Sequence, residues 1–282
     1  MSIRHLGLRR RHEPCAAGTK EFVGSRQNTP VVSNRFESTI PFGEPELMRA
    51  SAFNHYLAEL DTQATESGSG TRLASLSPSL LADLVRFEKS RGHIGVLEVM
   101  AAAMRHARRL TVHLQFDERV IPLTLFPQEG MVHCPVNLCE WPAGALQPLR
   151  VMHVEPAILR PPGDPEPALV GEPQLHFPLA PLLWALALQG TRGELLSEIA
   201  GPAVYRVAPG LDISALPGNP TLHAAVSRLR RQASPLRDLA EWPGLDRERA
   251  SRLLNALYLQ AGLMISRSHP DGIGESWFGG SR

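Results

Sequence analysis

Two histidines and two cysteines stand close together near the middle of the sequence: His133, Cys134, Cys139 and His153. Residues of these types bind zinc, and a cysteine with a nearby histidine base also serves as a nucleophile. If this stretch is a strand, His133 and Cys134 point to opposite faces and cannot easily bind one ion. Cys134, Cys139 and His153 then remain as a candidate metal or thiol site. The alternative, which we favour, is that Cys134 is a small apolar residue buried at a strand end.

Short catalytic motifs are missing from the sequence. It contains no P-loop, no Gly-x-Gly-x-x-Gly, no His-Glu-x-x-His, no Gly-x-Ser-x-Gly and no EF-hand loop. Together these absences lower the expectation of a common nucleotide-binding or hydrolytic enzyme. We therefore predict a protein that is not an enzyme, with no catalytic, cofactor-binding or metal-binding residue.

Arginines near the C-terminus form the second group of candidates: Arg247, Arg249, Arg252 and Arg267. Arginines at the start of a helix contact DNA phosphates or a protein partner. Two acids, Asp246 and Glu248, alternate with them and would repel phosphate, so we expect only weak, salt-sensitive DNA binding. The four arginines are therefore predicted contacts to a partner or to phosphate.

Three helices and a strand must position these arginines. The predicted elements are a helix over 221–232, a short helix over 235–242 capped by Ser234, a third helix over 247–261 capped by Asp246, and a strand over 263–268. This is the element order of a winged helix. Leu254 and Leu257 lie on the apolar stripe of the third helix, whereas Arg252 lies off it and should face solvent or a partner.

Earlier in the chain the spacing of apolar residues changes from the period of a helix to the two-residue period of a strand. The predicted elements are a helix over 45–60, a loop over 61–79, helices over 79–108 broken at Gly92, strands over 110–116, 119–126, 131–134 and 149–155, two short helices over 179–200 broken at 190–193, and a strand over 203–209. The first three strands form an antiparallel meander. Pro122 lacks an N–H donor and should distort the middle strand or lie in a bulge.

Composition sets the broad class. The 282 residues are 43% apolar with a net charge of +1, which is enough for a packed core and gives no bulk attraction to nucleic acid or anionic membrane. An odd number of cysteines and the lack of an apolar leader segment predict a cytoplasmic protein.

We predict an α+β protein with these parts: a disordered arm (1–45), a domain of helices and a small antiparallel sheet (46–155), a Pro-rich connector (156–178), a winged-helix-like domain (179–269) and a tail (270–282).

Two segments, 108–135 and 233–266, resemble the PATAN-type family, which is named for the N-terminal region of the response regulator PatA. The first match carries a strand followed by a turn glycine and a "Val-His" pair, at Leu110, Val112, Phe126, Gly130, Val132 and His133, with Cys134 where the family often has Ala. The second covers Leu236, Leu239, Gly244, Leu245, Leu254, Leu257, Gly262 and Leu263, with Asp238 in place of Glu and Met264 in place of Ile. The resemblance implies a scaffold in bacterial signalling, motility or polarity whose partner is a small Ras-like GTPase or a roadblock protein.

We therefore expect a non-enzymatic protein that binds other proteins. Two alternatives stay open at this point. One is a DNA-binding transcriptional regulator that uses the C-terminal winged helix, and the other is a thiol or metal-dependent enzyme at Cys134, Cys139 and His153.

Overall fold

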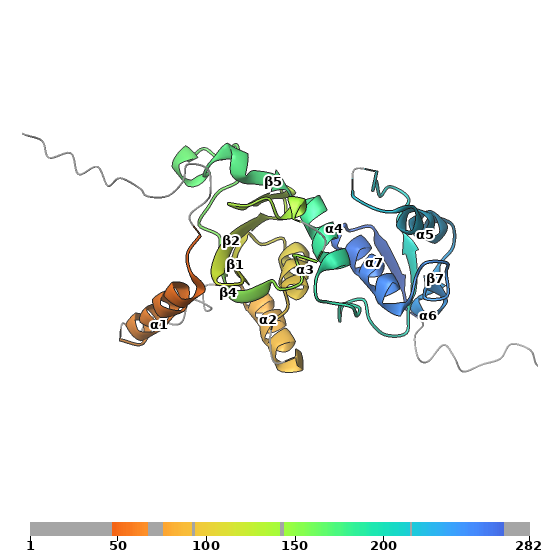
Figure 1. Ribbon diagram of the computed structural model, residues 1–282, viewed down its shortest axis with the longest axis horizontal. Helices are drawn as coiled ribbons and strands as arrows, with labels where there is room; N and C mark the ends of the chain where they lie inside the picture. The colour runs from red at the N-terminus through yellow and green to blue at the C-terminus, as the bar shows by residue number, and fades with distance from the viewer. Residues whose placement is uncertain (1–46, 67–75, 92–93, 142–143, 215, 268–282) are drawn as a thin grey trace, which may run out of the picture. The chain divides into compact units, whose positions relative to one another are not determined.

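The computed structural model describes residues 47–66, 76–91, 94–141, 144–214 and 216–267, all of which belong to one compact unit (Figure 1). Helices and antiparallel sheets make up an α+β fold, as predicted. The predicted arm 1–45 and tail 270–282 lie outside the described residues. Within the described part, no helix combines the length and apolar character needed to cross a bilayer.

Three helices precede the first sheet: α1 (Ala50–Glu66), α2 (Pro78–Arg91) and α3 (Val96–His106). The last two confirm the prediction for 79–108. The first helix begins later than predicted, because the residues before it pair with the β1–β2 hairpin, and it extends to Glu66, into the predicted loop. Val120 donates its N–H to the carbonyl of Met48, and Arg49 forms a bridge with Arg119.

Five antiparallel strands form the larger sheet, in the order β4-β1-β2-β3-β5. They are β1 (Leu110–Phe116), β2 (Arg119–Phe126), β3 (Met131–His133), β4 (Arg150–Pro156) and β5 (His176–Pro178). The meander of β1, β2 and β3 is confirmed, with turns that place Asp117 and Gly130 at positive φ. The Pro-rich connector predicted for 156–178 includes β5 and two short 3-10 helices, η3 (Pro167–Leu169) and η4 (Pro173–Leu175).

The prediction that Pro122 distorts the middle strand is wrong. The register of β1 and β2 is continuous, with Pro122 directly opposite His113. Because β3 pairs only with residues 124–126, β2 is an edge strand at Pro122, where a missing N–H donor is tolerated. The bulge lies on the other side of β1, where Met152 is an extra residue in β4.

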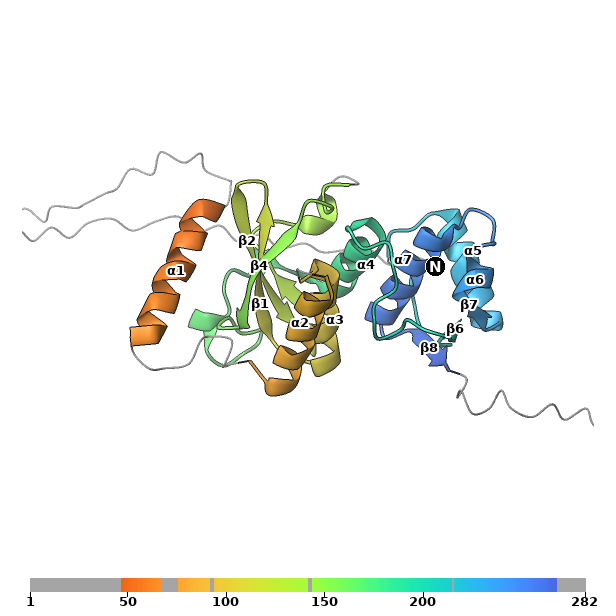
Figure 2. The same cartoon turned by 90° about the horizontal axis from the view of Figure 1, so that it is seen from below.

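One face of this sheet belongs to the main core and the other does not. Alternate residues of β1, including Val112 and Leu114, are fully buried and pack with α2 and α3. Figure 2 shows α2 and α3 on one side of the sheet and α1 on the other. On the α1 side, Phe53 packs on Val120 in a small separate cluster. The sheet thus presents an inner apolar face and an outer, more polar face.

The C-terminal half is built around two helices, α4 (Leu179–Gln189) and α7 (Arg247–Leu259), which pack against each other. The other elements are β6 (Val204–Val207), α5 (Pro220–Arg231), β7 (Ser234–Pro235), α6 (Leu236–Leu239) and β8 (Leu263–Ser266). The three short strands form a sheet in the order β7-β6-β8. Its central strand, β6, comes from before α5, so no hairpin joins it to β8.

Two local predictions in this half are wrong. Residues 194–200 form turns and not a second helix, because Asn255 of α7 bonds the carbonyl of Glu194 and the N–H of Leu196. Ser234 does not cap α6. It is buried in β7, opposite Tyr205, and Pro235 stands at the cap position without a side-chain bond. The cap of α7 is as predicted, since Asp246 accepts the N–H of Arg249 at 2.8 Å.

Candidate functional site

The structure separates Cys134 from His153. Cys134 is buried in the main core at the end of β3, and its N–H bonds the carbonyl of Leu175. His153 lies opposite His113 on the outer face of the sheet, with ring centroids 5.9 Å apart. Among the described side chains, no group of three His, Cys, Asp or Glu is arranged to hold a metal ion. The geometry therefore does not join Cys134 with His153, and the side chain of Cys139 lies outside the described ones.

Histidines occupy the outer face of the five-stranded sheet instead. His133 and His176 are direct neighbours on β3 and β5, with their rings edge-to-face at 4.9 Å. Burial lowers the pKa of His133, the positive charge of a protonated His176 lowers it further, and Glu172 acts in the opposite direction. His113 bonds the carboxylate of Glu155 at 3.0 Å. These contacts leave the buried Nε2 of His176 without a hydrogen-bond partner among the described residues.

The four predicted arginines have different environments. Arg247 is exposed and makes no ion pair within the described residues. Arg249 is also exposed, with its guanidinium 3.3 Å from the carbonyl of Gly244 and 3.6 Å from Asp246. Arg267 bonds the carbonyl of Glu198 at 2.6 Å. Arg247, Arg249 and Arg267 are therefore exposed, and Arg267 is tied to the backbone by carbonyl contacts.

The prediction that Arg252 faces solvent is wrong. Its side chain is only 13% exposed, and its guanidinium donates to the carbonyls of Leu188 and Gly190, both at 2.8 Å. Glu248 pairs with the same guanidinium at 2.8 Å. Because the last carbonyls of a helix lack helical partners, Arg252 acts as a side-chain cap for the C-terminus of α4.

Helix α7 is buried along nearly its whole length. Its buried residues are Ala250, Ser251, Leu253, Leu254, Asn255, Ala256, Leu257 and Leu259. The predicted apolar stripe is confirmed at Leu254 and Leu257, which have no exposed surface. Gln260, just after the helix, bonds the carbonyl of Ala180 in α4. Only the first turn of α7 stands free of the core.

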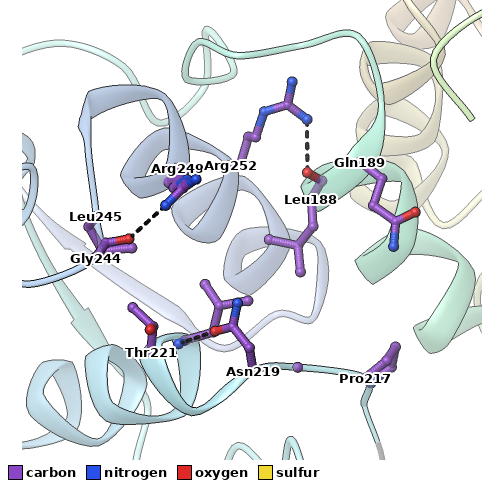
Figure 3. Close-up of a pocket in the computed structure, with 11 residues that line it drawn as sticks. Leu188, Gln189, Pro217, Asn219, Thr221, Gly244, Leu245, Arg249 and Arg252 are labelled. Carbon is purple, nitrogen blue, oxygen red and sulfur yellow. Dashed lines mark hydrogen bonds between the residues drawn. The ribbon is translucent and has the colours of Figure 1, made fainter. Parts of the chain in front are cut away.

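A pocket of about 480 Å³ opens beside this first turn, between α4, α5 and α7 (Figure 3). We call it the α4–α5–α7 pocket. Its lining residues are Leu188, Gln189, Pro217, Gly218, Asn219, Thr221, Leu222, Gly244, Leu245, Arg249 and Arg252. Figure 3 shows the side chain of Leu188 pointing toward the start of α5. The walls are mainly apolar, and the formally charged lining residues are both arginines.

The walls of this pocket are fixed by specific contacts. The buried indole of Trp184 donates to the carbonyl of Pro217 at 2.6 Å and holds that loop against α4. Asn219 caps α5 by accepting the N–H of Leu222. Gly244 has a φ of +76°, and a Cβ there would lie 2.7 Å from the Thr221 methyl group, so both backbone and space require glycine. The pocket is therefore a preformed part of the fold.

A second pocket, of about 720 Å³, lies on the other side of the α7 first turn. Its charged lining residues are Arg247, Glu248 and Glu194, so its mixed charge differs from that of the α4–α5–α7 pocket. Sequence reasoning identified the arginines but missed both pockets, because their walls come from segments distant in the sequence. Asn219 followed by Pro220 is a sequence pattern that marks the start of a helix. It indicates the beginning of α5, which forms one wall of the α4–α5–α7 pocket.

Comparison of the chain with protein-family models, with curated proteins and with solved structures finds no match. The PATAN-type resemblance and the winged-helix assignment stay predictions.

Proposed function

We propose that this chain is a non-enzymatic protein-interaction module that binds its partner through the first turn of α7 and the α4–α5–α7 pocket. The observation that carries the proposal is the burial of α7. A helix that reads DNA lies in the major groove and keeps one face open along several turns. In α7 the residues beyond the first turn pack on α4 and the core, which leaves a short convex turn beside a concave apolar pocket.

Charge on this surface also favours a protein partner over DNA. Asp246 and Glu248 alternate with Arg247 and Arg249 in the exposed turn, and such mixed charge repels phosphate as much as it attracts it. The PATAN-type resemblance supports the same class, a scaffold in bacterial signalling, motility or polarity.

Site-specific photo-crosslinking in the native cell tests this proposal. A photoreactive phenylalanine replaces Pro217, which is exposed at the rim of the pocket, and the control carries it at Glu118 in the β1–β2 turn. We expect a discrete protein adduct from position 217 and none from position 118, with the partner identified by mass spectrometry. Absence of a protein adduct at 217, or an adduct with DNA, would contradict the proposal.

A further inference from the structure

We propose that the α4–α5–α7 pocket recognises an acidic peptide segment of the partner, with a bulky apolar side chain in the pocket and a carboxylate on Arg249. This inference rests on the proposed protein-binding function and specifies the chemistry of the partner. Three features of the pocket carry it: its charge, its apolar walls and the availability of one guanidinium.

The charged side chains that line the pocket are both positive, and their acidic neighbours Asp246 and Glu248 lie outside the lining. The lining includes two arginines and no acidic residue. Arg252 bonds two carbonyls and pairs with Glu248, so its charge is balanced and the complementarity depends on Arg249. The first turn of α5 also lines the pocket, and a helix N-terminus favours negative charge. A peptide that carries a carboxylate is therefore electrostatically complementary to this pocket.

Arg249 is the group that binds the carboxylate. Its side chain is 67% exposed, and its contact with Asp246 is long, at 3.6 Å. An exposed ion pair of this kind contributes little and is easily exchanged. A carboxylate that forms two short charge-assisted hydrogen bonds with the guanidinium would replace it with a stronger contact.

The apolar walls define the second half of the recognised motif. Leu188, Leu222 and Leu245 come from three separate segments and line the same space. The volume, about 480 Å³, lies toward the lower end of the range of small-molecule pockets, about 300–1,000 Å³. It suits one anchoring aromatic or aliphatic residue and its neighbour. We therefore expect the acid within one or two positions of the apolar anchor.

The chain offers a matched control for Arg249. Arg247 is in the same exposed turn of α7, two residues earlier, but it lines the opposite pocket together with Glu194 and Glu248. Charge reversal at either position changes the net charge of the protein equally. Only the change at Arg249 alters the α4–α5–α7 pocket, so the pair separates a local effect from a general electrostatic one.

The experiment selects from a random dodecapeptide phage library on the full chain, then measures synthetic selected peptides by fluorescence anisotropy. We expect enrichment of peptides with Asp or Glu next to Leu, Phe or Trp. Arg249→Glu should weaken their binding by about tenfold or more, whereas Arg247→Glu should change it by less than about twofold. Leu222→Ala, which removes part of the apolar wall without changing charge, should also weaken binding.

Three results would overturn the inference: no enriched peptide, an enriched motif without acids, or equal effects of the two charge reversals. Thermal melts of each variant identify any loss of fold. The crosslinking experiment separates the two proposals. A protein adduct at position 217 combined with a basic or purely apolar selected motif would leave the interaction function standing and remove the acidic motif.

Discussion

The outer face of the five-stranded sheet and helix α7 both carry polar side chains, and they use them differently. On the sheet, polar groups pair with one another across neighbouring strands, as in Thr111 with Thr124 at 3.1 Å and His133 with His176. In α7, Arg252 and Asn255 bond backbone groups about sixty residues away in the sequence. The polar groups of the sheet face thus contact side chains on neighbouring strands, whereas those of α7 bond the backbone at the end of α4 and in the turns that follow it. Loss of a side chain should therefore be more costly in α7 than on the sheet face.

The largest effect is expected from the apolar side of α7. Leu254 is fully buried, so Leu254→Ala should lower the free energy of unfolding by about 2–5 kcal/mol through lost packing and a residual cavity. Urea melts of the whole chain measure this loss. Thr111→Ala on the outer sheet face is the comparison, expected to cost about 1 kcal/mol for one hydrogen bond. Equal losses at the two positions would contradict the distinction between α7 and the sheet.

Arg252→Ala is expected to cost somewhat less, about 1.5–3 kcal/mol, because it removes charge-assisted hydrogen bonds and leaves the carbonyls of Leu188 and Gly190 without their donor. Glu248→Ala is the matched control. Glu248 is 62% exposed, so its loss breaks the ion pair but keeps both carbonyl bonds, and should cost about 0.5 kcal/mol. If the two variants melt alike, the ion pair and not the cap of α4 is what Arg252 supplies.

Local patterns in the sequence predict local elements well. The period-two alternation, a two-residue turn and a turn glycine gave the bounds of β1 and β2 and the meander they form with β3. In α7, the apolar stripe and the Asp246 cap are likewise encoded within a few residues. Each of these features depends on residues only a few positions apart, so the sequence alone is enough to predict it.

Features that depend on distant segments were missed. Turns replace a helix over 194–200 because Asn255 binds the backbone there, and Ser234 enters a strand because β6 pairs with it. The role of Arg252 depends on where α4 ends. For the same reason only part of the candidate site could be predicted. The arginines could be identified in the sequence, but the apolar walls beside them come from segments that meet only in the folded chain.

A smaller, pH-dependent effect is expected from the histidine pair on the sheet. The pKa of His133 is lowered in the folded state, mainly by burial, so the unfolded chain binds a proton more readily. Stability is therefore fully present above about pH 6.5 and declines as the pH falls below that value. His133→Gln should reduce this decline in melts between pH 7.5 and 5. An unchanged pH profile would contradict the contribution of His133.

The smallest effect is expected at Arg247, in the exposed first turn of α7. It forms no ion pair within the described residues, so Arg247→Ala should change the free energy of unfolding by less than about 0.5 kcal/mol. The helix propensities of Arg and Ala differ little, so the backbone gives no further reason for a change.

The small change in the free energy of unfolding expected for Arg247→Ala is the reference for the larger change expected for Arg252→Ala. The two arginines lie five positions apart on one helix, yet one caps α4 and the other projects from the first turn. Urea melts of the two variants under identical conditions measure the difference directly. A cost at Arg247 comparable to that at Arg252 would mean that the first turn is held by packing. It would then not be a free surface, and the proposed binding region would have to be reconsidered.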